Sequence, residues 1–235
     1  MNKIDILEPK DFPLQLLEIP EPPKKLYIKG ALPPVNALYL AVVGSRKYTS
    51  YGKEACEKII YDLGRSNVKG QMSIVIVSGL ALGIDAIAHR AALDAGLTTV
   101  AFPGSGLQDS VLYPAANFNL GQKIIESGGA LISEFEPDFK ATPYSFPQRN
   151  RLMAGISRGV LIVEAEEKSG TLITARLATE YNRDVFVVPG SIFSPQSKGI
   201  QQLLKLGATP VSSGIDILEH WGIAQESRSV NQELR

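Results

Sequence analysis

The sequence has few of the residues that bind metal ions or cross-link a chain. Cys56 is the only cysteine, and His89 and His220 are the only histidines among 235 residues. A single cysteine cannot form an intramolecular disulfide, and a structural zinc site uses four cysteine or histidine ligands. We therefore expect a protein without disulfides and without a metal site.

The sequence also lacks a long apolar run at its N-terminus and an excess of either charge. Charged residues are scattered over positions 3–11, so the first 19 residues form neither a signal peptide nor a membrane-spanning helix. We expect a cytoplasmic protein.

Lys plus Arg and Asp plus Glu number 24 each. This balance excludes a polybasic protein, which would bind nucleic acid through the positive electrostatic field of the whole molecule. A local basic patch is compatible with this balance.

Length and composition favour one large α/β domain with a sizeable core, since 44% of the residues are hydrophobic and 20% are charged. Seven prolines interrupt residues 1–35, for which we predict an extended Pro-rich leader anchored on the domain surface by its leucines. Residues 36–222 then form the domain, and residues 223–235 form a disordered polar tail.

Short apolar runs alternate with helix-like segments from residue 37 onward. Several runs are apolar throughout, which is typical of parallel strands that are buried on both faces. This alternation predicts a doubly wound, mainly parallel sheet with helices on both faces. The expected strands are 38–43, 74–77, 98–102, 130–133, 160–163, 185–188 and 209–211, and the expected helices are 50–65, 84–95, 117–127, 150–157, 171–182, 199–206 and 214–221.

Small and hydroxyl-bearing residues follow these strands. In a doubly wound sheet the ligand binds outside the carboxyl ends of the strands, where open N–H groups and helix N-termini favour phosphate. Each glycine, taken by itself, is explained by a tight turn between a strand and a helix. The presence of several such glycine-bearing junctions on one edge of the sheet favours a phosphate-binding rim. The segments concerned are Gly44-Ser45-Arg46, Ser78-Gly79 through Gly83, 103–106, Ser169-Gly170-Thr171 and 189–191.

The fingerprints of common nucleotide cofactors are missing from this rim. Gly104 and Gly106 are followed by Asp109 where a G-x-G-x-x-G motif requires a third glycine, and no G-x-x-x-x-G-K-[ST] occurs. We therefore expect neither an NAD site nor an ATP cradle, and no cofactor.

The segment 146–151 combines an aromatic residue, two arginines and an asparagine just before an expected helix. Arginine forks suit phosphates, and an aromatic face suits an unstacked base. The residues concerned are Phe146, Arg149, Asn150 and Arg151. The alternative is a surface loop whose arginines pair with nearby carboxylates.

Several acidic residues have two interpretations each. Asp85 and His89 lie one helical turn apart and form either a catalytic pair or, more simply, a helix cap and a half-buried histidine. Glu134 and Glu164 end strands and are either catalytic carboxylates or partners that fix the arginines. Cys56 lies among apolar residues and is assigned to the core.

Read in order, these junctions resemble the DNA processing protein A (DprA/Smf) family between about residues 37 and 213. The matching motifs are Val43-Gly-Ser-Arg46, Tyr51-Gly52, Val77 to Ala86, Ala88-His89, Tyr113-Pro114, Ile132-Ser-Glu134, Phe146 to Arg151, Val163-Glu-Ala165, Ser169 to Ala175, Val188-Pro-Gly190 and Leu206-Gly-Ala208. The resemblance implies an extended Rossmann-like domain that binds single-stranded DNA and is not an enzyme.

The resemblance also implies a biological role and partners. Members protect incoming single strands in natural transformation and load the RecA recombinase during recombination, and they act as homodimers through the C-terminal side of this domain. By motif, Ser45 and Arg46 hold a backbone phosphate and Phe146 stacks on a base. The implied DNA-binding set is Gly44, Ser45, Arg46, Ser78, Gly79, Phe146, Arg149, Asn150, Arg151, Ser169, Gly170, Thr171 and Lys198.

The chain departs from the family pattern outside its central part. Many members add an N-terminal helical domain and a C-terminal winged-helix domain, for which the flanks are expected to be too short, and Gln201 replaces a usual asparagine. The rival interpretation is a nucleotide phosphoribohydrolase of the lysine decarboxylase-like group. Gly170-Thr171 is similar to part of that group's motif, but Thr174 stands where its catalytic glutamate would be. A third possibility is an interaction module that contacts only protein.

Overall fold

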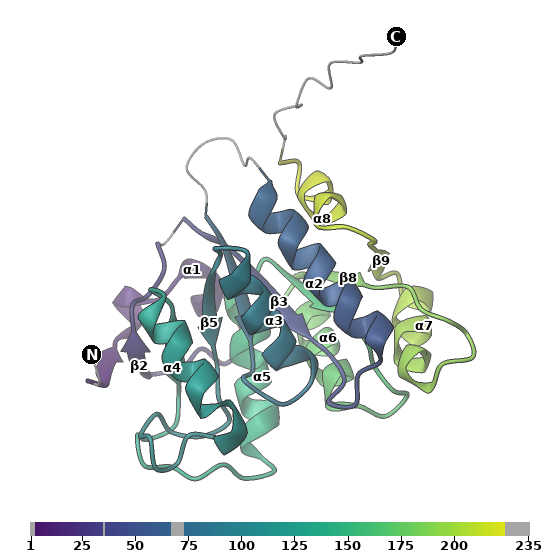
Figure 1. The fold of residues 1–235 in the computed structure, drawn as a ribbon. Coiled ribbons are helices and arrows are strands. Elements are labelled where there is room, and N and C mark those ends of the chain that lie inside the picture. The colour runs from purple at the N-terminus through teal and green to yellow at the C-terminus, as the bar shows by residue number, and fades with distance from the viewer. Residues whose placement is uncertain (1–2, 35, 67–72, 224–235) are drawn as a thin grey trace.

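The computed structural model describes residues 3–34, 36–66 and 73–223. Figure 1 shows a sheet with helices packed against it. The strands are β1 (Asp5–Leu7), β2 (Leu26–Gly30), β3 (Leu38–Val43), β4 (Ile74–Ser78), β5 (Thr98–Ala101), β6 (Ala130–Ser133), β7 (Gly159–Ile162), β8 (Asp184–Val187) and β9 (Thr209–Pro210). The helices are α1 (Leu14–Leu17), α2 (Ser50–Arg65), α3 (Ile84–Asp94), α4 (Phe118–Glu126), α5 (Ser145–Ile156), α6 (Gly170–Glu180), α7 (Lys198–Lys205) and α8 (Gly214–His220).

The described strands form one sheet in the order β1-β2-β6-β5-β4-β3-β7-β8-β9. All pairs from β6 to β9 are parallel, whereas β1 and β2 are antiparallel additions. The chain winds outward from β3 to β6 and then resumes on the other side of β3 with β7. The winding direction reverses between β3 and β7, which is where a doubly wound sheet opens a crevice for ligands.

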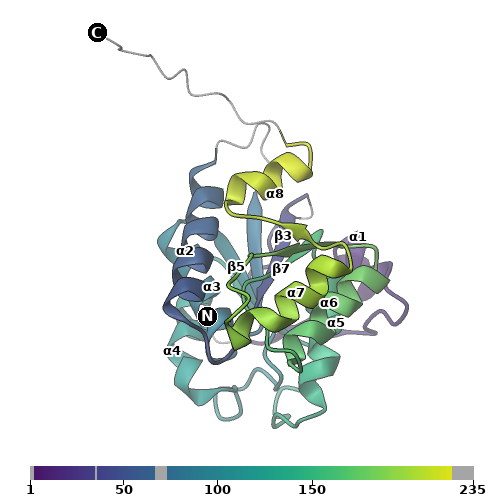
Figure 2. The same ribbon diagram turned by 90° about the vertical axis from the view of Figure 1, so that its right-hand side faces the viewer.

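Helices cover both faces of the sheet, as Figure 2 shows from the side. On one face, α1, α5, α6 and α7 bury residues such as Leu16, Leu152 and Ile200. Side chains of α2, α3, α4 and α8 form the apolar clusters on the other face. The structure therefore confirms the predicted Rossmann-like, doubly wound α/β fold.

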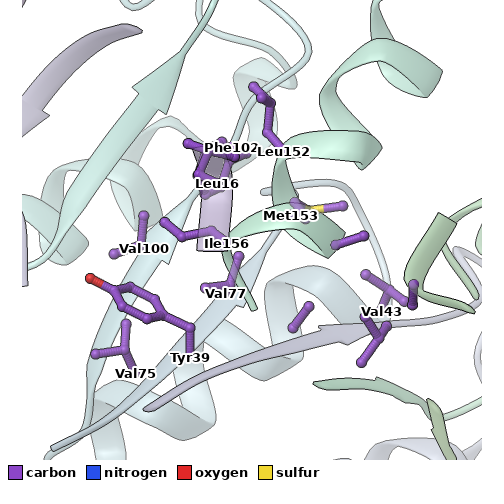
Figure 3. Packing of buried hydrophobic residues seen from close by; sticks show 14 of the residues in the cluster. Leu16, Tyr39, Val43, Val75, Val77, Val100, Phe102, Leu152, Met153 and Ile156 are labelled. Atoms are coloured by element: carbon purple, nitrogen blue, oxygen red, sulfur yellow. The ribbon is translucent and has the colours of Figure 1, made fainter. Parts of the chain in front are cut away.

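The central strand β3 shows why the apolar runs predicted this layering. All six of its residues are buried. Tyr39, Ala41 and Val43 pack into one cluster, part of which Figure 3 shows, while Leu38, Leu40 and Val42 pack into the other. Because alternate side chains point to opposite faces, a strand between two helical layers needs apolar residues at every position.

The N-terminal segment is more regular than the extended leader that the prolines predict. β2 pairs antiparallel with β6, and β1 pairs with β2. Phe12, Leu16 and Ile19 are buried in the main core rather than lying on the domain surface. The prolines limit the length of each element, and β2 occupies the proline-free run between Pro23 and Pro33. Of the expected tail at 223–235, all but the first residue lies outside the described residues.

Helix α5 begins at Ser145, five residues before the predicted start at 150. Pro147 does not prevent this start, because the first four N–H groups of a helix have no intrahelical partner. The segment 146–151 is therefore the first two turns of a helix and not the loop before it. None of the helices within the described ranges has the length and apolar character needed to cross a membrane.

Candidate nucleic-acid interface

A cleft of about 450 Å³ opens at the carboxyl ends of β3 and β7, at the point where the winding reverses. Three segments contribute most of its lining: the loop after β3, the first turns of α5, and the N-terminal end of α6. The lining residues are Val43, Gly44, Ser45, Arg46, Lys47, Ala81, Asp85, Phe146, Arg149, Asn150, Met153, Glu166, Ser169, Gly170, Thr171 and Thr174. The structure thus gathers most of the predicted DNA-binding set into one cavity.

The loop after β3 is fixed against the start of α3. A Cβ on Gly44 would lie 2.7 Å from the Ile84 side chain, so this position has no room for another residue. The Ile84 N–H donates to the Ser45 carbonyl at 3.2 Å, and the Ser45 hydroxyl accepts from the Lys47 N–H at 3.0 Å. Arg46 is exposed and forms no ion pair with any described residue. Its guanidinium is therefore available to an anion in the cleft.

Phe146 lies on the wall of the cleft beside Arg46. The Arg46 guanidinium lies 5.5 Å from the centre of the Phe146 ring, and the Tyr113 ring centre lies 5.7 Å from it. The Phe146 ring also packs on Gly104, where a Cβ would lie 2.6 Å from two ring atoms. An aromatic face and a cation therefore share one fixed wall, an arrangement that suits a base next to a phosphate.

Arg149 lines the cleft but is only 5% exposed. Its Nη1 donates to the Phe102 carbonyl at 2.5 Å, and the same atom fills the space that a Cβ on Gly79 would occupy. The Asp85 carboxylate accepts from the Gly79 N–H at 3.1 Å. Arg149 and Asp85 together hold the ends of β4 and β5 in place. Burial lowers the pKa of Arg149 to about 10, against the opposing effect of Asp85, so the guanidinium keeps its charge at neutral pH.

Arg151 is not among the residues lining the cleft. Its guanidinium pairs with the Glu134 carboxylate and donates to the Glu21 carbonyl at 2.9 Å. Two residues along a helix correspond to a rotation of about 200°, which is why Arg149 and Arg151 face opposite ways. For Arg151 the geometry favours the structural interpretation, in which a nearby carboxylate fixes the arginine.

The N-terminal end of α6 lines the same cleft as Arg46. Ser169 is the N-cap residue, but its hydroxyl caps no N–H and has no hydrogen-bond partner among the described residues. No atom lies within 4 Å of the place where a Cβ on Gly170 would be. Open N–H groups and the positive end of the helix dipole favour an anion here.

Asp85 and His89 do not form a catalytic pair. The N-cap of α3 is Gly83, so Asp85 does not cap the helix as expected; burial raises the pKa of its carboxyl. His89 is completely buried, not half-buried, and its Nδ1 lies 2.7 Å from the Thr99 hydroxyl. Burial lowers the pKa of His89 to about 3, so this imidazole is neutral.

Glu164 has a structural role and does not fix an arginine. Its buried carboxylate accepts from the Thr49 N–H at 3.0 Å and from the Thr49 hydroxyl at 2.5 Å. These contacts hold the start of α2 beside the end of β7. Cys56 is buried in the core, as expected, and burial raises the pKa of its thiol.

Three further members of the predicted set lie outside the cleft lining. Ser78 is completely buried and donates to the Val42 carbonyl at 2.6 Å. Gly79 borders a smaller hollow next to the cleft, which shares Arg46 and Phe146 with it. Lys198 is exposed at the first position of α7.

The predicted DNA-binding set left out Lys47 and Glu166, and Tyr113, which was named only as part of a family motif. Lys47 and Glu166 line the cleft, and Tyr113 lies against Phe146. Lys47 directly follows the Gly-Ser-Arg turn, and Glu166 lies two residues after a strand end that was singled out. Their positions at the sheet edge were the available signal in the sequence.

The fold and the cleft define a Rossmann-like α/β domain with a cleft lined by Arg46, Phe146 and the N-terminal end of α6 at its reversal point. Residues 3–222 match the model of the DNA recombination-mediator protein A family, and the chain belongs to that family. It is 40% identical to Protein Smf of Escherichia coli over 220 residues, which are 89% of this chain and 56% of that protein. It is 43% identical to DNA processing protein DprA of Streptococcus pneumoniae over 88% of this chain and 70% of that one.

Two solved structures share the fold at high coverage. The X-ray structure of DprA from Streptococcus pneumoniae has a TM-score of 0.82 at 39% identity and covers 92% of this chain and 74% of that one. A structure of DNA processing protein A from Helicobacter pylori, described for its single-stranded DNA binding mode, has a TM-score of 0.79 at 32% identity. It covers 93% of this chain and 95% of that one.

Proposed function

We propose that this protein binds single-stranded DNA in the cleft between the loop after β3 and the N-terminal end of α6. The observation that carries the proposal is the contact between Arg46 and Phe146 in a cleft that the N-terminal end of α6 also lines. The Helicobacter pylori relative, which has a single-stranded DNA binding mode, supports the same ligand for this chain.

In this proposal a backbone phosphate lies between the Arg46 guanidinium and the N–H groups around Ser45 and Gly170. A neighbouring base stacks on the Phe146 ring. Every base has an aromatic face, so stacking tolerates any sequence, but it requires a base that is not already paired in a duplex. Arg149 contributes its charge from the floor of the cleft and keeps the loops in place.

The biological role proposed here follows from the family. We assign to the protein the protection of incoming single strands and assistance in loading RecA during natural transformation, as a cytoplasmic homodimer without a cofactor. Family membership and about 40% identity to Smf and DprA proteins support this role.

We further propose that the protein has no enzymatic activity of its own. The alternative, a nucleotide phosphoribohydrolase, needs a glutamate where this chain has Thr174, whose side chain is buried at the back of the cleft. Glu166 is the exposed carboxylate in the lining. Release of free base from nucleoside monophosphates, abolished by Glu166→Gln, would overturn the non-enzymatic role.

Fluorescence anisotropy with labelled oligothymidylate tests the binding proposal directly. Unlabelled single strand is expected to compete, whereas a duplex of the same length is not. If the exposed cations Arg46, Lys47 and Lys198 contact phosphates, the slope of log K against log salt is expected to be about −2. Equal competition by duplex, or a slope near zero, contradicts the proposal.

A further inference from the structure

Leu80, in the loop that follows β4, has a backbone conformation that leucine rarely adopts. Among the described residues other than glycine, only Leu80 and Asn182 have a positive φ, at +57° and +55°. Asparagine enters this left-handed region readily, whereas in a bulky residue such as leucine the Cβ comes too close to the next carbonyl oxygen. Such a conformation persists only where the surrounding structure imposes it. Leu80 therefore marks a loop whose shape is held by other groups.

Asn117 holds this loop through two hydrogen bonds. Its Nδ2 donates to the Leu80 carbonyl at 2.8 Å and to the Ala81 carbonyl at 3.1 Å. A primary amide has two N–H donors, so each carbonyl receives one. Asn117 is only 3% exposed, and the Leu80 side chain is completely buried in the apolar cluster that α4 covers. The amide thus fixes the backbone of the loop while the cluster fixes its central side chain.

The far end of the same loop lies against the backbone of Arg46. Gly83 has a φ of +84°, and a Cβ on it would lie 2.6 Å from the Arg46 Cα. The next residue, Ile84, donates its N–H to the Ser45 carbonyl at 3.2 Å. A displacement of the loop therefore displaces the backbone that carries Arg46, which is the residue proposed to contact a phosphate.

Asn117 also joins this loop to the side of the cleft that carries Phe146. It lies in the connection between β5 and α4, four residues after Tyr113, whose ring centre is 5.7 Å from that of Phe146. The loop and this connection meet in the hollow beside the cleft, which both of them line together with Arg46 and Phe146. Asn117 itself lines neither the hollow nor the cleft. It can affect a ligand only through the segments that it joins.

We propose that Asn117 is a positioning residue for DNA binding, whose amide keeps the loop after β4 in the shape that supports Arg46. The inference rests on the proposed function and deepens it, because it names a residue outside the cleft that sets the affinity of the cleft. Without the two donors, Leu80 relaxes towards the conformations that leucine prefers. Only a fraction of the molecules then keep the binding form of the loop, and the apparent affinity falls by that fraction.

Fluorescence anisotropy with labelled oligothymidylate tests this inference, at a temperature where melting curves show that every variant is folded. Asn117→Ala is expected to weaken binding by about 10-fold, the effect of losing hydrogen bonds that favour one form of the loop. Thr99→Val is the matched control, because the Thr99 hydroxyl is also buried and donates to the Ile76 carbonyl at 2.8 Å, inside the sheet. Thr99→Val is expected to lower the melting temperature and to bind DNA like the wild type.

A double-mutant cycle with Arg46→Ala tests whether Asn117 acts through Arg46. Substitutions of residues that act through one contact are not additive. We therefore expect Asn117→Ala to weaken binding much less in the Arg46→Ala protein than in the wild type. An equal loss in both proteins overturns the proposal, because Asn117 would then act independently of Arg46.

Asn117→Asp is the second variant, and it replaces Asn117→Ala in these measurements if the alanine variant does not fold. It keeps the shape of the side chain, but an ionised carboxylate only accepts hydrogen bonds, whereas a protonated carboxyl has one O–H donor. The affinity of Asn117→Asp relative to the wild type is therefore expected to fall between pH about 5 and about 9, as the buried carboxyl ionises. A ratio that does not change with pH contradicts the proposal.

The remaining outcomes separate this inference from the proposed function. If Asn117→Ala binds as tightly as Thr99→Val while both are folded, Asn117 serves only the stability of the fold. The positioning role is then wrong, although single-strand binding stands. If the wild type binds no oligonucleotide, the proposed function itself fails.

Discussion

The two basic segments of the cleft use their arginines in opposite ways. In the loop Gly44–Thr49, Arg46 is exposed and has no acidic partner among the described residues, and the backbone of the loop is held by the hydrogen bond from the Ile84 N–H to the Ser45 carbonyl. In the first turns of α5, Arg149 is buried on a carbonyl and Arg151 is paired with Glu134. We therefore expect Arg46, and not Arg149 or Arg151, to bind the ligand directly, because the latter two already have structural partners.

The largest effect is expected from Arg149→Ala, which tests the structural half of this comparison. Removing the guanidinium leaves the buried Phe102 carbonyl without its donor and the buried Asp85 carboxyl without the nearby positive charge, and a buried polar group left unsatisfied costs about 1–3 kcal/mol, more when it is charged. Urea denaturation measures this loss in the free energy of unfolding. A variant as stable as the wild type would mean that Arg149, like Arg46, is not needed to maintain the fold.

Arg46→Ala is expected to have the next largest effect, on DNA affinity alone. A charged hydrogen bond contributes about 1.5–3 kcal/mol, and Arg46→Lys should recover part of it because the charge remains while the bidentate fork is lost. Anisotropy measures the affinity, and thermal melting should match the wild type.

Arg151→Ala serves as the control for Arg46→Ala, because it makes the same change in charge outside the cleft lining. We expect its DNA affinity to equal that of the wild type. Equal losses in the two variants would mean that the cleft does not decide which arginine binds DNA.

Phe146→Ala is expected to weaken DNA binding by about 1–3 kcal/mol, the range for one stacked base. The salt dependence of binding should stay nearly unchanged, because no phosphate contact is lost. The ring also packs on Gly104, so a melting curve must show that the variant is folded at the assay temperature. A folded variant with normal affinity would move the base-stacking position away from Phe146.

Glu166→Gln is expected to have the smallest effect and the opposite sign. Its exposed carboxylate lines the cleft with Arg46 and Lys47 and should repel a phosphate there. Removing one exposed charge should strengthen binding by up to about 1 kcal/mol, with the gain decreasing as salt is raised. Unchanged affinity at low salt would indicate that the phosphate does not pass Glu166.

The layered sheet and the edge that carries the cleft were predictable, because strands such as β3 are apolar at every position and parallel strands end on a common edge. The buried role of Arg149 was not predicted, because the helix was expected to start at 150 and not at Ser145, and the pairing of Arg151 with a carboxylate was offered only as the alternative. With the true start, Arg149 shares its face with Leu152, Met153 and Ile156, which is the spacing of a buried stripe. The partner of Arg151 lies 17 residues away on another element and leaves no local pattern.

The N-terminal strands were missed for a similar reason. β2 is a run of five residues whose partner β6 lies about a hundred residues later in the chain. Local propensity indicated only a stretch interrupted by prolines, and the pairing that makes it a strand depends on tertiary structure.

The antiparallel strands at one end of the sheet also bear on solubility. Without them, β6 would present a row of unpaired N–H and C=O groups, which is a template for aggregation with other chains. Here the sheet ends in the three-residue β1 on one side and in the two-residue β9, with its Pro210, on the other. Both ends are too short to recruit another strand, so the N-terminal segment acts as a guard against edge-to-edge association.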